Sequence, residues 1–187
     1  MVGLGGTMRP GSSTERVLRV ALDAAAAAGA RTLLLGAADL DLPMYAPQSA
    51  YRSRAARRLV DELGRADGVI IASPGYHGAP SGLIKNALDY AEDLRDADAP
   101  YLDGRAVGCI ACASGWQAAA TTLTALRAVA HALRGWPTPL GVTINSATGA
   151  FATDGALTDG TERDRLELVG RQVVEFARQR ALAFNGM

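Results

Sequence analysis

The sequence predicts an α/β fold, an open parallel sheet with helices on both faces. Short apolar segments alternate along the chain with segments of helical periodicity, the order expected of such a sheet. The apolar segments are hydrophobic at successive positions rather than at every second one, as in strands that are covered on both faces. Hydrophobic residues make up 49% of the 187 residues and charged residues 20%, which is typical of a globular protein. We expect residues 1–187 to form a single domain.

Five segments are predicted as strands because they are short, apolar and bounded by turn residues. They cover residues 2–7, 31–35, 68–73, 106–113 and 140–144. The predicted helices, which carry apolar residues at helical spacing, cover residues 15–28, 54–65, 83–94, 117–133 and 161–184. The first helix begins at a capping box formed by Ser12 and Glu15, and Gly29 suits its end. Loops are expected at residues 40–51 and 145–160.

The charge balance and the cysteine count narrow the class of protein. Because 19 basic residues offset 19 acidic ones, the chain lacks the basic surface that nucleic-acid binding or a polybasic membrane anchor requires. No apolar run reaches the roughly 20 residues of a spanning helix, and no secretory signal opens the chain. Its 2 cysteines make no disulfide framework. We therefore expect a cytoplasmic protein without nucleic-acid or membrane partners.

Three turns are candidates for a binding site, because ligands of open α/β sheets bind at the carboxyl ends of the strands. They are residues 7–14, 74–82 and 113–117. The first turn joins a strand to a helix, so its backbone N–H groups and the helix dipole favour an anion. Hydroxyls and one guanidinium suited to phosphate oxygens accompany them. These side chains belong to Thr7, Ser12, Ser13, Thr14 and Arg9.

Several ligands could occupy a turn of this kind. A nucleoside triphosphate site needs a lysine where Ser12 stands. A dinucleotide site needs a third glycine where Met8 stands, and an acid after the second strand, where the chain has Gly36. A ligand with a terminal phosphate monoester requires neither that lysine nor that glycine and acid. An ordinary capped turn that binds no ligand is the remaining alternative.

Two motifs carry a resemblance to a known family. Residues 6–14 read G-T-M-R-P-G-S-S-T, and residues 73–90 read S-P-G-Y-H-G-A-P-S-G-L-I-K-N-A-L-D-Y. Together they resemble the NAD(P)H-dependent FMN reductase family, which has similar segments after its first and third strands. The resemblance implies a flavodoxin-like three-layer sandwich whose five-stranded parallel sheet has the order 2-1-3-4-5. It also implies FMN as the cofactor and NAD(P)H as a transient electron donor.

The resemblance implies a role for each matched position. The FMN phosphate would be held by Thr7, Arg9, Ser12, Ser13 and Thr14. The ribityl chain and the edge of the flavin ring would lie against Pro74, Gly75, Tyr76, His77 and Gly78, and the ring itself beside Ser114, Gly115 and Trp116. The chain departs from the family pattern at Thr7, where serine is frequent, at Thr14, where asparagine is frequent, and at Gly75, where the residue is often acidic. Trp116 adds bulk to a loop of small residues, which bears on how open the ring face is.

Several residues could serve either structure or chemistry. His77 is either a polar turn residue beside the cofactor or a proton donor, and no other residue is a catalytic candidate, because the flavin itself carries the redox chemistry.

Cys109 and Cys112 lie three apart in a predicted strand. They should point to opposite faces, which predicts neither a disulfide nor a metal site. Lys85 and Asp89 share one helix face, and the resemblance places that helix at a dimer interface.

The resulting hypothesis is an FMN-binding oxidoreductase. NAD(P)H would pass a hydride to FMN, and the reduced flavin would reduce a quinone, an azo compound or another acceptor, or supply reduced FMN to a flavin-dependent monooxygenase. The protein would be a homodimer or homotetramer. One alternative is a specialised biosynthetic flavoenzyme of the same fold. Another is a non-enzymatic flavodoxin-like electron carrier, although a neutral chain lacks the charge that steers such carriers to their partners.

Overall fold

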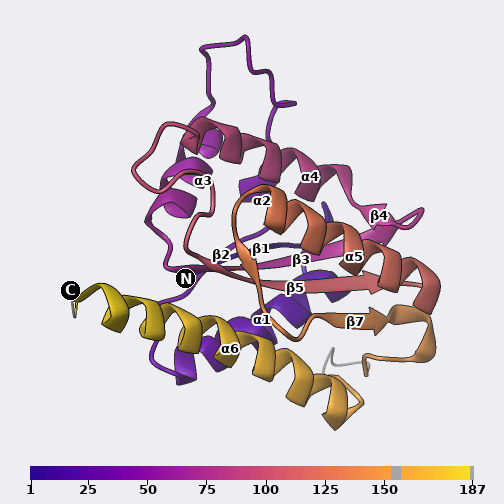
Figure 1. Ribbon diagram of the computed structural model, residues 1–187. Coiled ribbons are helices and arrows are strands. Elements are labelled where there is room, and N and C mark those ends of the chain that lie inside the picture. Colours follow the sequence, from indigo (N-terminus) through magenta and orange to yellow (C-terminus); the bar gives the residue numbers. More distant parts are fainter. Residues whose placement is uncertain (153–156, 186–187) are drawn as a thin grey trace.

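The computed structural model describes residues 1–152 and 157–185, and it places one sheet between two layers of helices (Figure 1). The strands are β1 (Val2–Gly5), β2 (Leu33–Leu35), β3 (Gly68–Tyr76), β4 (Ala79–Pro80), β5 (Ala106–Ala113), β6 (Trp136–Pro137) and β7 (Val142–Asn145). The α-helices are α1 (Ser13–Ala27), α2 (Ala37–Leu40), α3 (Arg54–Arg65), α4 (Gly82–Asp89), α5 (Trp116–Ala132) and α6 (Gly160–Asn185). Two 3₁₀ turns, η1 (Tyr90–Leu94) and η2 (Ser146–Thr148), complete the elements.

The strand order confirms the predicted topology. The main strands run β2-β1-β3-β5 and continue with β7, all of them parallel, which is the expected order 2-1-3-4-5. The sheet has seven strands rather than five for two reasons. The short β6 pairs with the beginning of β5 while β7 pairs with its end, and β4 folds back antiparallel on β3. The fold is therefore the predicted one with two short additions.

Buried side chains fill both faces of the sheet, as the unbroken apolar strands predicted. Along β3, Val69 and Ile71 belong to a core cluster shared with helices α3, α4 and α5. Their neighbours Ile70 and Ala72 belong to a second cluster, shared with α1 and α6. Figure 1 shows the same division, with α1 and α6 on one side of the sheet. Successive strand residues point to opposite faces, so each face needs its own layer of helices.

The two cysteines show the same alternation. Cys109 lies in the cluster with α3 to α5, and Cys112 lies in the cluster with α1 and α6. Both thiols are free and buried. Burial raises the pKa of each thiol to about 12, so both carry their proton at neutral pH. The prediction that they form no disulfide is confirmed, and among the described residues no group of His, Cys, Asp and Glu could hold a metal ion.

Some predicted boundaries were wrong. Residues 74–76 were predicted as a turn, but they extend β3: Pro74 pairs with Cys112 of β5, and Gly75 and Tyr76 pair with β4. The helix predicted over residues 83–94 ends as α4 at Asp89 and continues as the 3₁₀ turn η1. No helix was predicted between residues 36 and 53, but Ala37–Leu40 form the single-turn helix α2, which is too short to show a helical period. The predicted loop 145–160 includes residues 153–156, which lie outside the described residues.

The loop predicted over residues 40–51, together with Arg52, is held against α4 and η1. The Arg52 guanidinium makes a bidentate ion pair with Asp93, at 2.5 and 2.8 Å, which holds the pKa of Asp93 below its usual value. The Tyr45 backbone N–H donates to the side chain of Asn86 at 2.8 Å, and the Tyr45 ring meets Tyr90 edge-on. This segment, predicted as a surface loop, is therefore anchored at both ends. Within the described residues no helix is long and apolar enough to cross a bilayer.

Candidate functional site

The carboxyl ends of β1, β3 and β5 surround a cleft of about 350 Å³. Its walls contain most of the residues predicted for the site, namely Thr7, Arg9, Ser12, Ser13, Thr14, Pro74, Gly75, Tyr76 and Ser114. The other predicted residues, His77, Gly78, Gly115 and Trp116, follow these directly in the chain but do not line the cleft. The three turns selected from the sequence therefore meet in space.

The first turn presents donors at the beginning of α1. Ser12 caps the helix, because its hydroxyl accepts the Glu15 N–H at 3.3 Å. Thr7 Oγ1 accepts the Arg9 N–H at 3.1 Å, which closes the turn on itself. As the first residues of the helix, Ser13 and Thr14 have N–H groups that no acceptor among residues 1–152 and 157–185 satisfies. These two N–H groups are the ones a bound anion would use.

The expected capping box is only half formed. Its second bond should join the Glu15 carboxylate to the Ser12 N–H, but that carboxylate accepts the Gly11 N–H instead, at 3.1 Å. Glu15 also accepts a hydrogen bond from Arg19 at 2.7 Å, and this bond holds the pKa of Glu15 below its usual value. The positive charge of Arg19 is thus paired with the carboxylate of Glu15. Arg9 makes no ion pair with any described residue, so its guanidinium is available to a ligand.

The second turn is a tight β-hairpin between β3 and β4. Tyr76 pairs with Ala79, which leaves His77 and Gly78 as a two-residue loop with φ values of 53° and 81°. A hairpin loop with two positive φ angles favours glycine or asparagine, so His77 holds a conformation that costs it energy. Below the hairpin, the buried Ser73 hydroxyl accepts the Ser81 N–H at 3.0 Å. That bond fixes the hairpin to the start of α4.

Gly75 is a glycine because α5 leaves no room for a side chain. A Cβ atom at position 75 would lie 2.6 Å from Thr122 Oγ1 and 3.1 Å from the Cβ of Ala113. Thr122 is fully buried, and its hydroxyl has no hydrogen-bond partner among the described residues. The close approach explains the departure from the acidic residue that the family often carries here. It also keeps the main chain of Gly75 bare at the wall of the cleft.

The third turn contributes Ser114 to the cleft and then starts α5. Gly115 precedes the helix without a side-chain cap, and Trp116, predicted as a loop residue, is its first residue. Sequence reasoning missed two further cleft residues, Cys112 and Ser146. Ser146 directly follows β7, so the rule that ligands bind at the carboxyl ends of strands could have identified it. Cys112 was assigned to the core, and it indeed lies on the buried floor of the cleft.

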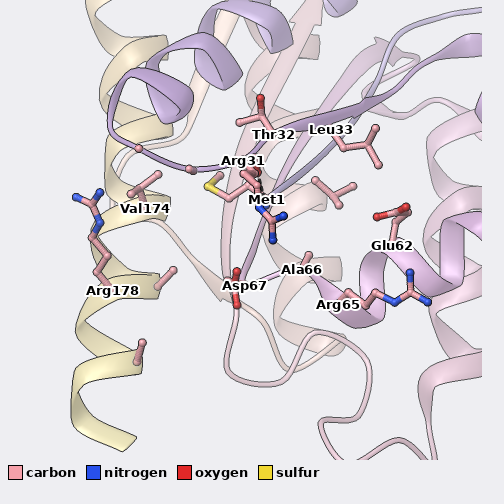
Figure 2. Close-up of a pocket in the computed structure, with 15 residues that line it drawn as sticks. Met1, Arg31, Thr32, Leu33, Glu62, Arg65, Ala66, Asp67, Val174 and Arg178 are labelled. Carbon is pink, nitrogen blue, oxygen red and sulfur yellow. Dashed lines mark hydrogen bonds between the residues drawn. The ribbon is translucent and has the colours of Figure 1, made fainter. Parts of the chain in front are cut away.

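A larger cavity of about 640 Å³ lies at the opposite end of the sheet (Figure 2). It is lined by the start of β1 and β2 and by the C-terminal parts of α3 and α6. Arg31, Arg65, Glu62 and Asp67 surround it, and none of these charges forms an ion pair within the described residues. This cavity faces the amino ends of the strands, whereas ligands of this architecture bind at the carboxyl ends. We therefore place the site at the smaller cleft.

The cleft is suited to a phosphate monoester. It offers hydroxyls, free helix N–H groups and one unpaired guanidinium, and no carboxylate among the described residues lines it. A comparison with known protein families identifies the family of the chain. The chain matches the NADPH-dependent FMN reductase model over residues 1–149. The chain belongs to the NADPH-dependent FMN reductase family.

Relatives of this FMN reductase family member include two azoreductases. The chain is 32% identical to the NADPH azoreductase of Bacillus sp. (strain OY1-2) over 89 residues, which is 47% of either chain. It is 32% identical to the FMN-dependent NADPH-azoreductase of Staphylococcus aureus over 120 residues, 63% of this chain and 60% of that one. The chain thus matches only about half to three-fifths of the length of these relatives.

A solved structure shares the fold over nearly the whole length. It is that of FerB, a flavoenzyme NAD(P)H:(acceptor) oxidoreductase from Paracoccus denitrificans. The TM-score is 0.73, the identity is 22%, and the alignment covers 96% of this chain and 97% of FerB. Together with the strand order, this likeness confirms the flavodoxin-like fold expected from the sequence of this FMN reductase family member.

Proposed function

We propose that the protein is an FMN-binding oxidoreductase that transfers electrons from NAD(P)H to a small-molecule acceptor. The observation that carries the proposal is the cleft at the carboxyl ends of β1, β3 and β5, where the donor-rich first turn meets a wall formed by the main chain of Gly75. Membership of the NADPH-dependent FMN reductase family supports the choice of FMN. The names of the two azoreductase relatives support NADPH as donor and an azo compound as acceptor.

In this proposal the first turn holds the phosphate. The N–H groups of Ser13 and Thr14, with the hydroxyls of the turn, donate to the phosphate oxygens, and the Arg9 guanidinium neutralises their charge. The helix dipole of α1 adds to the attraction. Thr7 serves indirectly, because its hydroxyl shapes the turn that carries Arg9. The phosphate thereby fixes the cofactor at one end of the cleft.

In the same proposal the second and third turns, residues 74–82 and 113–117, receive the flavin ring. FMN supplies the redox chemistry when it is bound, accepting a hydride and passing two electrons on. The main chain of Gly75 and the side chains of Tyr76 and Ser114 line that part of the cleft. The net reaction with a quinone consumes NAD(P)H, one proton and the quinone, and it releases NAD(P)⁺ and the hydroquinone. Solvent supplies the proton, so the reaction needs no side-chain acid.

Anaerobic stopped-flow absorbance tests the proposal directly. The FMN-loaded protein is mixed with NADH or with NADPH, and the flavin band near ~450 nm is followed as the ring is reduced. We expect bleaching with at least one donor, which also identifies that donor. Tight FMN binding without bleaching by either donor would contradict the proposed reductase. It would favour an electron carrier or an enzyme that takes its electrons from its own substrate.

We predict that His77→Asn keeps the activity and does not lower the stability. Asparagine adopts the left-handed conformation more readily than histidine does, so the variant should unfold at an equal or higher temperature. The turnover with NAD(P)H and a quinone should stay within about threefold of wild type, because general acid catalysis typically contributes about 100-fold or more. Thermal melting and steady-state assays measure the two effects. A loss of about 100-fold in turnover with an intact fold would instead identify His77 as the proton donor.

Three further expectations extend the proposal. We propose a single domain and a homodimer or homotetramer, in keeping with the interface role that the resemblance gives to the helix of Lys85 and Asp89, which form an ion pair on the surface of α4. We propose a cytoplasmic location. Reduced FMN could also be delivered to a flavin-dependent monooxygenase, and release of reduced FMN from the protein during turnover would support that partner.

A further inference from the structure

Two exposed aromatic side chains stand beside the cleft without a ring partner. Tyr76 lies at the end of β3, lines the cleft and is 56% exposed. Trp116 begins α5, two residues after the cleft residue Ser114, and is 54% exposed. Neither ring pairs with another aromatic ring within the described residues. Leaving two large aromatic surfaces in water at one site is unfavourable unless something covers them.

The two aromatic residues come from elements that are packed together. Helix α5 contacts the β3–β4 hairpin, and Figure 1 shows its N-terminal half beside β4. A Cβ atom at Gly78 would lie 3.0 Å from Thr121 Oγ1, and one at Gly75 would lie 2.6 Å from Thr122 Oγ1. This contact fixes the start of α5 relative to the hairpin. Tyr76 and Trp116 are thus held on the same side of the molecule as the cleft.

Trp116 is also where the chain departs from the small-residue loop of its family. The helix that it begins has no side-chain cap, and the indole is 54% exposed. Trp116 does not itself line the cleft, but it lies two residues after Ser114, which does. A large flat side chain just outside a flavin site has the chemistry to stack on a flat aromatic substrate.

We propose that Trp116, together with Tyr76, forms a stacking surface for planar aromatic electron acceptors, and that Trp116 sets the preference of the enzyme for such acceptors over small inorganic ones. This inference rests on the proposed function and adds a specificity-determining residue to it. The reaction served is the two-electron reduction of a quinone, with the hydride originating from NAD(P)H and one proton from solvent. The hydroquinone and NAD(P)⁺ are the products.

The test compares two acceptors in Trp116→Ala and Trp116→Phe. Menadione is a planar naphthoquinone, and ferricyanide is an inorganic acceptor that cannot stack. We expect the ratio of kcat/KM for menadione to kcat/KM for ferricyanide to fall about fivefold to tenfold in Trp116→Ala, since aromatic stacking is of this size. In Trp116→Phe, which keeps an aromatic face, the ratio should fall less than about threefold.

Trp136→Ala is the matched control. Trp136 is exposed to a similar extent, 58%, but it lies on β6, outside the cleft, and packs on Phe176 with a centroid distance of 6.0 Å. Its replacement should leave the acceptor ratio at the wild-type value. An equal fall in both tryptophan variants would overturn the proposal. So would an unchanged ratio in Trp116→Ala, or a change in its oligomeric state, which would show that a second copy of the chain covers the indole.

A second measurement separates this inference from the proposed function. The bound FMN is reduced by light in the presence of EDTA, so that no NAD(P)H is needed, and its reoxidation by each acceptor is followed by stopped flow. If NAD(P)H fails to reduce the wild-type flavin, the proposed reductase function is wrong, while the acceptor preference can still be measured. If Trp116→Ala alters only the reduction by NAD(P)H, then Trp116 serves the donor and the inference is overturned.

Discussion

Arg9→Ala is expected to weaken FMN binding by about 1.5–3 kcal/mol, the size of a hydrogen bond to a charged group. This is roughly a tenfold to hundredfold increase in Kd. The reason is that Arg9 is the guanidinium in the cleft wall without an ion pair among the described residues. Neighbouring Arg19 cannot replace it, because it is bonded to Glu15. Quenching of FMN fluorescence on binding to the apoprotein measures the affinity.

Two controls separate a phosphate contact from a general effect of charge. Arg31→Ala removes the same charge at the opposite end of the sheet, in the wall of the larger cavity (Figure 2), and should leave the FMN affinity within about twofold, because exposed charges at that distance are screened. Riboflavin, which lacks the phosphate, should bind wild type and Arg9→Ala equally well. A parallel loss of riboflavin affinity would show that Arg9 contacts the ring or shapes the turn. Unchanged FMN affinity would remove the phosphate assignment altogether.

The sheet was predictable because its signal is local and repeated. In β3 and β5 almost every residue is apolar and buried, and only a strand with helices on both faces can bury such a sequence. The opposite orientations of Cys109 and Cys112 follow from the same alternation. The first turn of the cleft was also predictable, since the capping serine, the glycine and the hydroxyls are neighbours in the chain. Features formed by residues that are close together in the sequence could therefore be predicted from residue types alone.

The unpredicted features depend on contacts between distant segments. Pro74 and Gly75 have the composition of a turn, but they continue β3 because Pro74 pairs with β5 and β4 folds back onto Gly75. The need for glycine at position 75 is set by Thr122 on α5, and no sequence pattern connects these two positions. The capping box was predicted from spacing, yet the Glu15 carboxylate bonds to Gly11. Which of two adjacent N–H groups it takes depends on how the turn is folded.

Arg105→Ala should lower the free energy of unfolding by about 3–4 kcal/mol, because the residue makes two short charge-assisted hydrogen bonds, each worth about 1.5–3 kcal/mol. Arg105 is only 7% exposed. Its Nε donates to the Ala66 carbonyl at 2.7 Å and its Nη2 to the Gly64 carbonyl at 2.8 Å. Longer bonds of Nη1 reach the carbonyls of Tyr101 and Asp103. Urea denaturation of the wild type and the variant measures the difference.

The size of this effect follows from where the bonded carbonyls lie. Gly64 belongs to α3 and Ala66 is its C-terminal cap, so the guanidinium satisfies carbonyls that a helix end leaves without partners. The same side chain joins the end of α3 to the segment that enters β5, whose far end carries Ser114 of the cleft. Loss of Arg105 should therefore loosen the connection at the amino end of the sheet, while the turn of residues 7–14 keeps its own hydrogen bonds.

Arg105→Lys and Arg95→Ala are the informative controls. Lysine keeps the charge but has no planar fork, so it can satisfy one carbonyl at a time and should recover only part of the loss. Arg95 is exposed and paired with Glu92 on the surface, and exposed pairs of this kind contribute little to stability, so its replacement should change the free energy of unfolding far less than Arg105→Ala does. If Arg105→Lys were as stable as wild type, charge alone would account for the role of Arg105. The claim that the guanidinium fork joins α3 to the segment before β5 would then be wrong.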